Sequence, residues 1–367
     1  MNITIVAGTR PNFIKIAPII KAIQIKQKNN QTIYFRLVHT GQHYDENMSQ
    51  SFFIDLNIPQ PDINLGCGGG TQAEQTAAIM IAFEKELINS PADIVLVVGD
   101  VTSTLACSIA AKKLNTKVAH VEAGIRSFDL SMPEEINRMV TDSITDYFFT
   151  TSLWASKNLK KAGICNKRIF FVGNVMIDTL IANRQRFNKP QLYDELKLID
   201  KQYFVMTLHR PGNVDDVEKL RSLISFVADN ANGLPVVFPS HPRTAEIMKK
   251  FNIDKENLHT VKPLGYLEFN YLVAHSKAVI TDSGGITEET TVMGIPCMTL
   301  RENTERPETV NLGTNKLIGS DSRCIKAAFD ELFSGHWPKG IVPDLWDGRA
   351  AERIVKRLVI LNEKGEI

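Results

Sequence analysis

The sequence lacks an excess of charge of either sign. Its 367 residues include 42 Lys and Arg against 41 Asp and Glu, so the formal net charge is only +1. A chain so close to neutrality gives no general electrostatic reason to bind nucleic acid or an anionic membrane. We therefore expect neither a nucleic acid nor a membrane as a partner.

The sequence also has few cysteines and no long hydrophobic run. Its five cysteines form no CxxC pair and no His-rich spacing, which argues against a zinc site or a disulfide framework. No apolar stretch is long enough to span a bilayer. The chain enters a β-rich run at Ile3–Val6 without a basic and apolar signal segment. We expect reduced thiols, no metal and a cytoplasmic location.

What the chain does have is an alternation of short apolar strands and amphipathic helices in both of its halves. A length of 367 residues exceeds what one core usually serves. Strands that end in glycine or polar residues before a helix are typical of doubly wound α/β sheets. We predict two such sheets facing across a central cleft, with the polar segment 187–201 as the link.

The stretch Thr281–Glu289, TDSGGITEE, has the pattern of a phosphate-binding turn. It follows the apolar run Ala278–Ile280 and precedes a helix. Two glycines let the backbone approach a ligand, and the helix N-terminus offers N–H groups to a phosphate. Two glutamates follow in the same stretch. The alternative is an ordinary strand–helix turn whose acidic residues satisfy the helix dipole.

Three acidic residues follow successive strands of the first half. Asp100 closes the apolar run that ends at Val98, Glu122 closes the next strand, and Glu134 opens a later helix. Taken singly, Asp100 could be an N-cap, and Glu134 with Pro133 could be ordinary capping. Carboxylates gathered at one sheet edge repel one another, which makes one of them a plausible acid or base.

Cations and a histidine also stand at strand ends. Arg10 and Lys15 flank the first strand–helix turn, where they would favour a diphosphate. His209 ends the first strand of the second half and opens a loop. The alternatives are two solvated charges and a structural histidine.

Taken together, these strings resemble the non-hydrolysing UDP-N-acetylglucosamine 2-epimerases over nearly the whole chain. The resemblance rests on the order and spacing of GTRP with Lys15, GQH at 41–43, GD at 99–100, HVEAGIRS at 120–127, MPEEINR at 132–138, HRPGN at 209–213, HPRT at 241–244, TDSGGITEE at 281–289 and TERPE at 304–308.

The resemblance implies the GT-B fold, a UDP-sugar substrate, no cofactor and a homodimer. Residues 1–185 would form an N-terminal Rossmann-like domain that carries the catalytic carboxylates. Residues 186–347 would form a C-terminal Rossmann-like domain that binds UDP, and 348–367 a helix that packs back towards the first domain. The implied reaction inverts C2 of the sugar, for surface polysaccharide precursors, by eliminating UDP to a 2-acetamidoglucal and adding it back.

The resemblance also implies roles for individual residues. Glu289 would hold the ribose, Phe269 would pack on uracil, and Arg10 would contact the diphosphate together with Ser283–Gly285. The implied catalytic residues are Asp100, Glu122, Glu134 and His209. The implied UDP-sugar-binding residues are Arg10, Lys15, Arg138, His241, Phe269, Ser283, Gly284, Gly285, Glu289 and Arg306.

Some positions depart from the family pattern. HRPGN replaces the commoner HRREN, and Thr287 stands where Gln is common. Gln42 and His43 fit a second, allosteric UDP-N-acetylglucosamine site found in some members. Asp45 replaces an expected Gln, and 68–70 lacks an expected arginine, which argues against allosteric activation.

Other functions stay open. GQHYDENM also resembles relatives that act on other UDP-2-acetamido sugars, such as 2,3-diacetamido uronic acids, and a hydrolysing epimerase would carry the same His209 and Glu134. A GT-B glycosyltransferase or a non-catalytic nucleotide-sugar sensor would not need the acidic trio.

Overall fold

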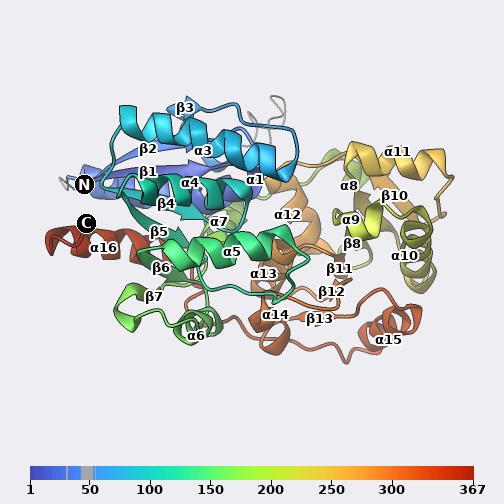
Figure 1. Cartoon of the computed structure of the whole chain (residues 1–367). Helices are drawn as coiled ribbons and strands as arrows, with labels where there is room; N and C mark the ends of the chain where they lie inside the picture. Colours follow the sequence, from blue (N-terminus) through green and yellow to red (C-terminus); the bar gives the residue numbers. More distant parts are fainter. Residues whose placement is uncertain (30–31, 43–52, 54) are drawn as a thin grey trace. The chain divides into compact units, whose positions relative to one another are not determined.

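The computed structural model describes residues 1–29, 32–42, 53 and 55–367. The chain forms two compact units, which we call unit 1 (Met1–Ala182 with Asp344–Ile367) and unit 2 (Asn183–Pro343). Each contains one sheet of parallel strands (Figure 1). The prediction of an α/β protein with two doubly wound sheets is confirmed.

The sheet of unit 1 has the strand order β3-β2-β1-β4-β5-β6-β7. The strand order reverses between β1 and β4, and ligands of open α/β sheets bind at such a point, outside the carboxyl ends of the strands. The strands are β1 (Asn2–Ala7), β2 (Tyr34–His39), β3 (Ile63–Asn64), β4 (Ile94–Val98), β5 (Lys117–Val121), β6 (Tyr147–Thr150) and β7 (Ile169–Phe171).

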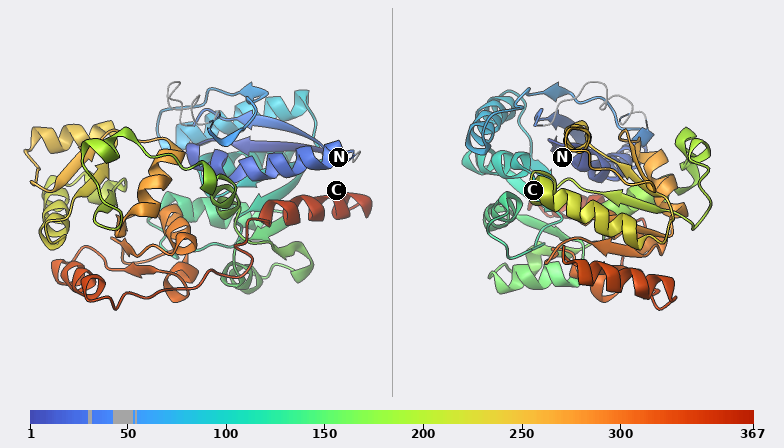
Figure 2. Two further views of the ribbon diagram at one scale, coloured as in Figure 1. Left: turned by 180° about the vertical axis from the view of Figure 1, so that it is seen from behind. Right: turned by 90° about the vertical axis from the view of Figure 1, so that its right-hand side faces the viewer.

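Helices cover both faces of this sheet. Phe83 of α3 belongs to one buried cluster with Ala106 of α4 and Val97 of β4. On the other face, α1 buries Ile16 and Ile20 and lies beside the last helix, α16 (Figure 2). The helices are α1 (Arg10–Lys28), α3 (Gln72–Asn89), α4 (Thr102–Lys113), α5 (Pro133–Ile144), α6 (Leu153–Lys161), α7 (Val175–Asn183) and α16 (Ala350–Glu363), with a 3-10 turn at Asn166–Arg168.

The last segment of the chain is fastened to unit 1 by specific hydrogen bonds. Asp178 on α7 accepts the backbone N–H groups of Ala350 (3.1 Å) and Ala351 (2.7 Å), and so caps α16. The indole of Trp346 donates to the carbonyl of Thr151 at 3.0 Å. Residues 344–367 are therefore an integral part of unit 1.

The sheet of unit 2 has the order β10-β9-β8-β11-β12-β13, so it too reverses, between β8 and β11. Its strands are β8 (Phe204–Thr207), β9 (Val236–Pro239), β10 (Leu258–Val261), β11 (Ala278–Thr281), β12 (Cys297–Thr299) and β13 (Asn315–Leu317). Its helices are α8 (Gln191–Glu195), α9 (Pro211–Val214), α10 (Val217–Asn230), α11 (Pro242–Lys250), α12 (Tyr266–His275), α13 (Gly284–Met293), α14 (Pro307–Asn311) and α15 (Ser322–Phe333), with a 3-10 turn at Arg184–Arg186.

The polar segment 187–201, predicted to link the two halves, lies within unit 2. The segment contains the short helix α8, and Tyr193 and Leu198 are buried in one of the two cores of unit 2. Tyr193 packs edge-on against Tyr203, with ring centroids 5.8 Å apart. Leu192 and Leu196 are partly buried against the same core, so several apolar side chains fix the segment against unit 2.

Among the described residues, no helix combines the length and the apolar character that crossing a membrane requires.

Candidate active site

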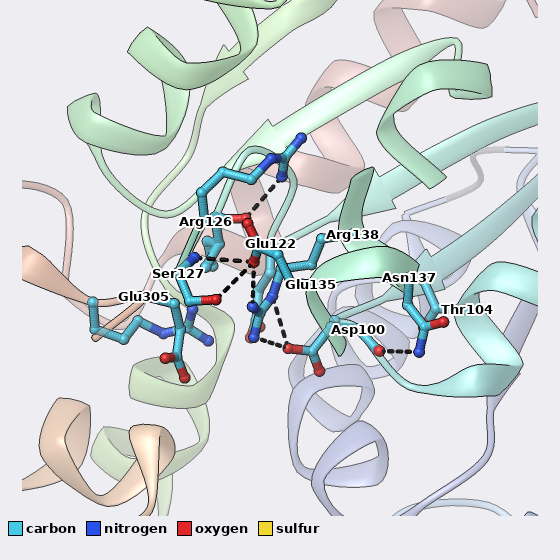
Figure 3. Close-up of polar contacts among 12 residues, drawn as sticks. Asp100, Thr104, Glu122, Arg126, Ser127, Glu135, Asn137, Arg138 and Glu305 are labelled. Atoms are coloured by element: carbon cyan, nitrogen blue, oxygen red, sulfur yellow. Dashed lines mark hydrogen bonds and ion pairs between the residues drawn. The ribbon is translucent and has the colours of Figure 1, made fainter. Parts of the chain in front are cut away.

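Asp100 and Arg138 form an ion pair at the carboxyl end of β4. The Arg138 guanidinium donates to Asp100 Oδ2 through Nε at 3.0 Å and through Nη2 at 2.5 Å (Figure 3). The Asn137 side chain donates to the Asp100 carbonyl at 2.8 Å. The N-cap of α4 is Val101, so Asp100 is not the cap of that helix. Its carboxylate is held by α5 instead.

Arg138 also forms an ion pair with Glu135, a residue that the sequence analysis did not single out. Arg138 Nη1 donates to Glu135 Oε2 at 2.7 Å. Glu135 is fully buried and also accepts the backbone N–H groups of Ser127 (2.9 Å) and Phe128 (3.1 Å). Of the two adjacent glutamates, Glu135 therefore fixes Arg138 and the backbone of Ser127 and Phe128, whereas Glu134 is exposed on the first turn of α5.

Glu122 and Lys15 form a second, deeply buried ion pair. Lys15 Nζ lies 2.7 Å from Glu122 Oε2, and both side chains are less than a tenth exposed. Glu122 has φ +70°, which is strained for a residue with a side chain and common at functional sites. A Cβ on Gly99 would lie 3.0 Å from Lys15 Nζ, so a glycine there leaves room for the ammonium.

A buried histidine and a buried aspartate support the strand ends around Glu122. His120 Nδ1 lies 2.8 Å from Asp142 Oδ1, and its Nε2 lies 2.8 Å from the Gly99 carbonyl. Burial raises the pKa of Asp142, but the hydrogen bonds and charges of His120 and Arg126 outweigh burial and hold that pKa below its usual value. The ends of β4 and β5 are thereby joined by a network of polar side chains.

The other predicted residues of unit 1 are Arg10, Gln42 and His43. Arg10 begins α1 and is partly buried; burial lowers its pKa, and Asp55 partly offsets that effect. The amide oxygen of Gln42 accepts the Ser103 hydroxyl at 2.8 Å and the Ser103 N–H at 3.2 Å. His43 and Asp45 lie outside the described residues.

In unit 2, His209 and Asp282 form a pair at the ends of the neighbouring strands β8 and β11. His209 Nδ1 lies 2.6 Å from Asp282 Oδ1. The imidazole is 59% exposed, whereas the aspartate side chain is fully buried. Burial raises the pKa of Asp282, but the hydrogen bonds from His209, Arg210 and Asn213 and the charge of His209 lower it by more. The pKa therefore stays below its usual value. Asp282 is thus an anion beside an exposed imidazole.

The turn after Asp282 leads into α13 with the predicted geometry. Ser283 is the N-cap of α13, and its hydroxyl makes no capping bond to that helix. Gly284 and Gly285 follow as the first helical residues, with N–H groups at the positive end of the helix dipole. A Cβ on Gly284 would lie 2.6 Å from Glu305 Oε1, so only glycine fits without a shift of Glu305.

The two glutamates of α13, Glu288 and Glu289, are buried. Burial raises the pKa of Glu289 to about 7, although hydrogen bonds from Tyr266 and Asn270 oppose the rise. The Tyr266 hydroxyl donates to Glu289 Oε1 at 2.9 Å. Glu288 lies 2.5 Å from Arg306 Nε, and both side chains are buried.

The two remaining predicted residues of unit 2 lie on α11 and α12. His241 is exposed as the N-cap of α11, where its Nδ1 accepts the Arg243 N–H at 3.3 Å. Phe269 on α12 is partly buried and packs against the core that contains Leu272. The structure thus groups Asp100 with Arg138 and Glu122 with Lys15 in unit 1. In unit 2 it places His209 beside the turn of Ser283.

Sequence reasoning missed the residues that hold these groups. Asp282, Glu135 and Asp142 each support a predicted residue or its strand end, and each is buried. Asp282 stands inside the TDSGG string at the end of a strand, which was a signal for a functional carboxylate. Glu135 and Asp142 lie on α5 and look like ordinary polar helix positions. In the part of the chain that the structure describes, no three His, Cys, Asp or Glu side chains are grouped to hold a metal ion.

Two Rossmann-like units with polar side chains at the carboxyl ends of their strands define an α/β protein of the GT-B class. The protein-family model for UDP-N-acetylglucosamine 2-epimerase matches residues 25–359. The chain belongs to the UDP-N-acetylglucosamine 2-epimerase family and is an isomerase. The predicted family is confirmed.

Several known proteins are similar to the chain over most of its length. It is 40% identical to a UDP-N-acetylglucosamine 2-epimerase of Methanocaldococcus jannaschii, over 98% of this chain and 99% of that protein. It is 41% identical to a UDP-2,3-diacetamido-2,3-dideoxy-D-glucuronate 2-epimerase of Pseudomonas aeruginosa, over 87% of this chain and 89% of that protein.

The fold is also similar to that of a solved structure. The crystal structure of the M. jannaschii UDP-GlcNAc 2-epimerase in complex with UDP-GlcNAc and UDP superposes with a TM-score of 0.89 at 39% identity. The match covers 98% of this chain and 100% of that one.

Proposed function

We propose that this protein interconverts UDP-N-acetylglucosamine and UDP-N-acetylmannosamine by inverting C2 of the sugar. The observation that carries the proposal is the pair of carboxylate–cation contacts at the carboxyl ends of β4 and β5, Asp100 with Arg138 and Glu122 with Lys15. Ionised carboxylates at a ligand-binding sheet edge can accept and return protons. The similarity to relatives named for this reaction supports the same substrate.

The C2 proton of the sugar is too weakly acidic for simple removal and return, because no carbonyl is adjacent to it. We propose that the enzyme removes this proton while the C1–O bond breaks. The C2–H electron pair becomes the C1–C2 double bond, and UDP leaves with the bonding electrons of C1–O. The 2-acetamidoglucal and UDP then recombine, and C2 takes up a proton on the opposite face.

Unit 1 would supply the proton chemistry. Two groups are needed, one for each face of C2, and the candidates are Asp100, Glu122 and Glu134. Asp100 and Glu122 are held by the cations described above, which keeps each carboxylate in a fixed position. Glu134 is exposed on the first turn of α5, so its carboxylate is accessible to a ligand.

Unit 2 would hold the leaving UDP. The N-terminus of α13 with Ser283, Gly284 and Gly285 suits a diphosphate, and His209 lies in the loop that follows the neighbouring strand β8. Glu289 would hold the ribose, and Phe269 would pack on uracil. Arg10, Lys15, Arg138, His241 and Arg306 complete the proposed set of UDP-sugar contacts.

The test is a comparison of substrates. Purified enzyme is incubated separately with UDP-N-acetylglucosamine and with the UDP-2,3-diacetamido uronic acid, and products are separated by anion-exchange chromatography. We expect UDP-N-acetylmannosamine from the first substrate at the higher kcat/KM. Absence of turnover of UDP-N-acetylglucosamine would refute the proposal, and release of free N-acetylmannosamine would favour a hydrolysing epimerase.

A second candidate substrate is the 2,3-diacetamido uronic acid itself. It is favoured by the 41% identity to the Pseudomonas aeruginosa enzyme, which is as high as that to the enzymes named for UDP-N-acetylglucosamine. The chemistry at C2 would be the same, so the same carboxylates would serve it. A higher kcat/KM for this substrate would replace the first proposal with the second.

We also propose a cytoplasmic homodimer that supplies surface polysaccharide synthesis. The homodimer and the polysaccharide role are supported by the family resemblance. Sedimentation equilibrium at micromolar concentration would test the dimer, with a mass near twice the chain's 41.0 kDa as the expected result.

A further inference from the structure

Asp282 ties the two functional strings of unit 2 together. Its carboxylate accepts the backbone N–H groups of His209 (3.2 Å) and Arg210 (3.0 Å) and the side-chain amide of Asn213 (3.1 Å). In return, Arg210 Nε donates to the Asp282 carbonyl at 3.1 Å. The loop that carries His209 is therefore fastened to the residue directly before Ser283.

The same carboxylate also determines which nitrogen of His209 carries a proton. Nδ1 and Asp282 Oδ1 are only 2.6 Å apart. Two lone pairs would repel at that distance, so one proton must lie between the two atoms. The hydrogen bonds and charges that surround Asp282 keep its pKa low, so the proton belongs to Nδ1 of the imidazole.

This bond leaves Nε2 as the nitrogen that can meet a ligand. The imidazole is 59% exposed, although one of its nitrogens is bonded to a fully buried group. A histidine that is free to rotate would present either nitrogen and would lose rotamer entropy on binding. A histidine held by a carboxylate presents one nitrogen in one direction.

We propose that Asp282 is a positioning residue for His209: it holds the proton on Nδ1 and fixes the ring orientation, so that Nε2, when it also carries a proton, donates a hydrogen bond to a diphosphate oxygen of the substrate. This proposal rests on the proposed function for the identity of the ligand. The alternative is a purely structural role, in which Asp282 fixes the loop only through the backbone N–H groups of residues 209 and 210. The two accounts differ in what His209 contributes to the effect of Asp282.

A double-mutant cycle separates them. The Asp282→Asn variant can place an NH₂ group against Nδ1, which disfavours the Nδ1–H tautomer. We expect kcat for UDP-N-acetylglucosamine to fall roughly 100-fold, as for loss of a positioned acid or base, with KM changed less than about threefold. In the His209→Ala background the same substitution should change kcat less than about twofold, because the imidazole that Asp282 positions is absent.

An equal loss of kcat in both backgrounds would overturn the proposal, because Asp282 would then act independently of the imidazole. Asp216→Asn is the matched control for the substitution itself. Asp216 also accepts backbone N–H groups, those of Glu218 and Lys219, as the N-cap of α10. It should leave kcat within about twofold.

A measurement on the unsubstituted enzyme does not depend on how the variants fold or on which substrate is turned over. The protein is labelled with ¹⁵N-histidine, and the His209 signals are assigned by their absence from His209→Ala. We expect Nδ1 of His209 to carry its proton at pH 8, with a hydrogen-bonded chemical shift. An unprotonated Nδ1 would refute the positioning role of Asp282 without bearing on the proposed reaction. A protonated Nδ1 in an enzyme that does not turn over UDP-N-acetylglucosamine would refute the proposed reaction alone.

Discussion

Replacement of Glu289 by glutamine should stabilise unit 2 in a pH-dependent way. Burial raises the pKa of Glu289 from the ordinary value of 4.5 to about 7 in the folded protein. Between these two pH values the unfolded chain has lost the proton and the folded protein still holds it. Unfolding therefore releases a proton, and stability falls as the pH rises through this window.

The magnitude follows from the separation of the two pKa values. Each pH unit corresponds to about 1.36 kcal/mol, so the buried carboxylate costs about 3 kcal/mol of folding free energy above pH 7 and nothing below pH 4.5. The amide of Glu289→Gln has nearly the same shape, can still accept the Tyr266 hydroxyl and carries no charge. The variant should match the unsubstituted protein at pH 4.5 and exceed its stability by about 3 kcal/mol at pH 8.

The assay is urea unfolding at several pH values between 4.5 and 8. Pulsed hydrogen exchange with mass spectrometry follows peptides from β11 and α13, because the two units need not unfold together. Glu256→Gln, at an exposed position of the same unit, is the control and should show no pH-dependent gain. A Glu289→Gln variant that is no more stable at pH 8 than at pH 4.5, relative to the unsubstituted protein, would refute the reasoning. If Glu289 holds the ribose, the same variant should bind UDP about tenfold more weakly by calorimetry.

Three further predictions concern unit 1. Lys15→Met should lower the free energy of unfolding by about 3–5 kcal/mol, because it leaves the buried Glu122 without its cation; a loss below about 1 kcal/mol in urea titrations would contradict this. Gly8→Ala should lower the free energy of unfolding by about 1–3 kcal/mol, because the added Cβ would lie 1.9 Å from the Ser103 hydroxyl oxygen. Gly212→Ala, where a Cβ would meet open space, is the control. It should lower the free energy of unfolding by less than half as much, measured by thermal unfolding of both variants. Arg138→Lys should lower kcat roughly tenfold, because one ammonium does not bridge two carboxylates as the guanidinium does; unchanged kcat in a coupled UDP-sugar assay would show that the bridge is dispensable.

The fold was predictable because its strands and helices have clear hydrophobic patterns in the sequence. The run Ile94–Val98 is continuously apolar and forms β4, whose residues are all buried. Helix α3 (Gln72–Asn89) begins after a capping residue, Thr71, whose side chain accepts the Glu74 N–H. Local hydrophobic period and capping chemistry were sufficient for these elements.

The partners of the candidate site residues were much harder to predict. Lys15 and Glu122 are 107 positions apart, and only the folding of α1 and β5 onto one sheet brings them to 2.7 Å. The role of Asp282 likewise depends on the neighbouring positions of β8 and β11. Sequence spacing indicates which residues stand at strand ends, whereas side-chain pairing depends on strand order and register that no local pattern contains.

The most direct test of the account is proton exchange at C2. UDP-N-acetylglucosamine is incubated with the enzyme in deuterated water, and the sugar is followed by proton NMR. The account predicts deuterium at C2 together with the appearance of UDP-N-acetylmannosamine, and the loss of both in Glu122→Gln. Inversion at C2 without deuterium incorporation, or no change at C2 at all, would contradict it.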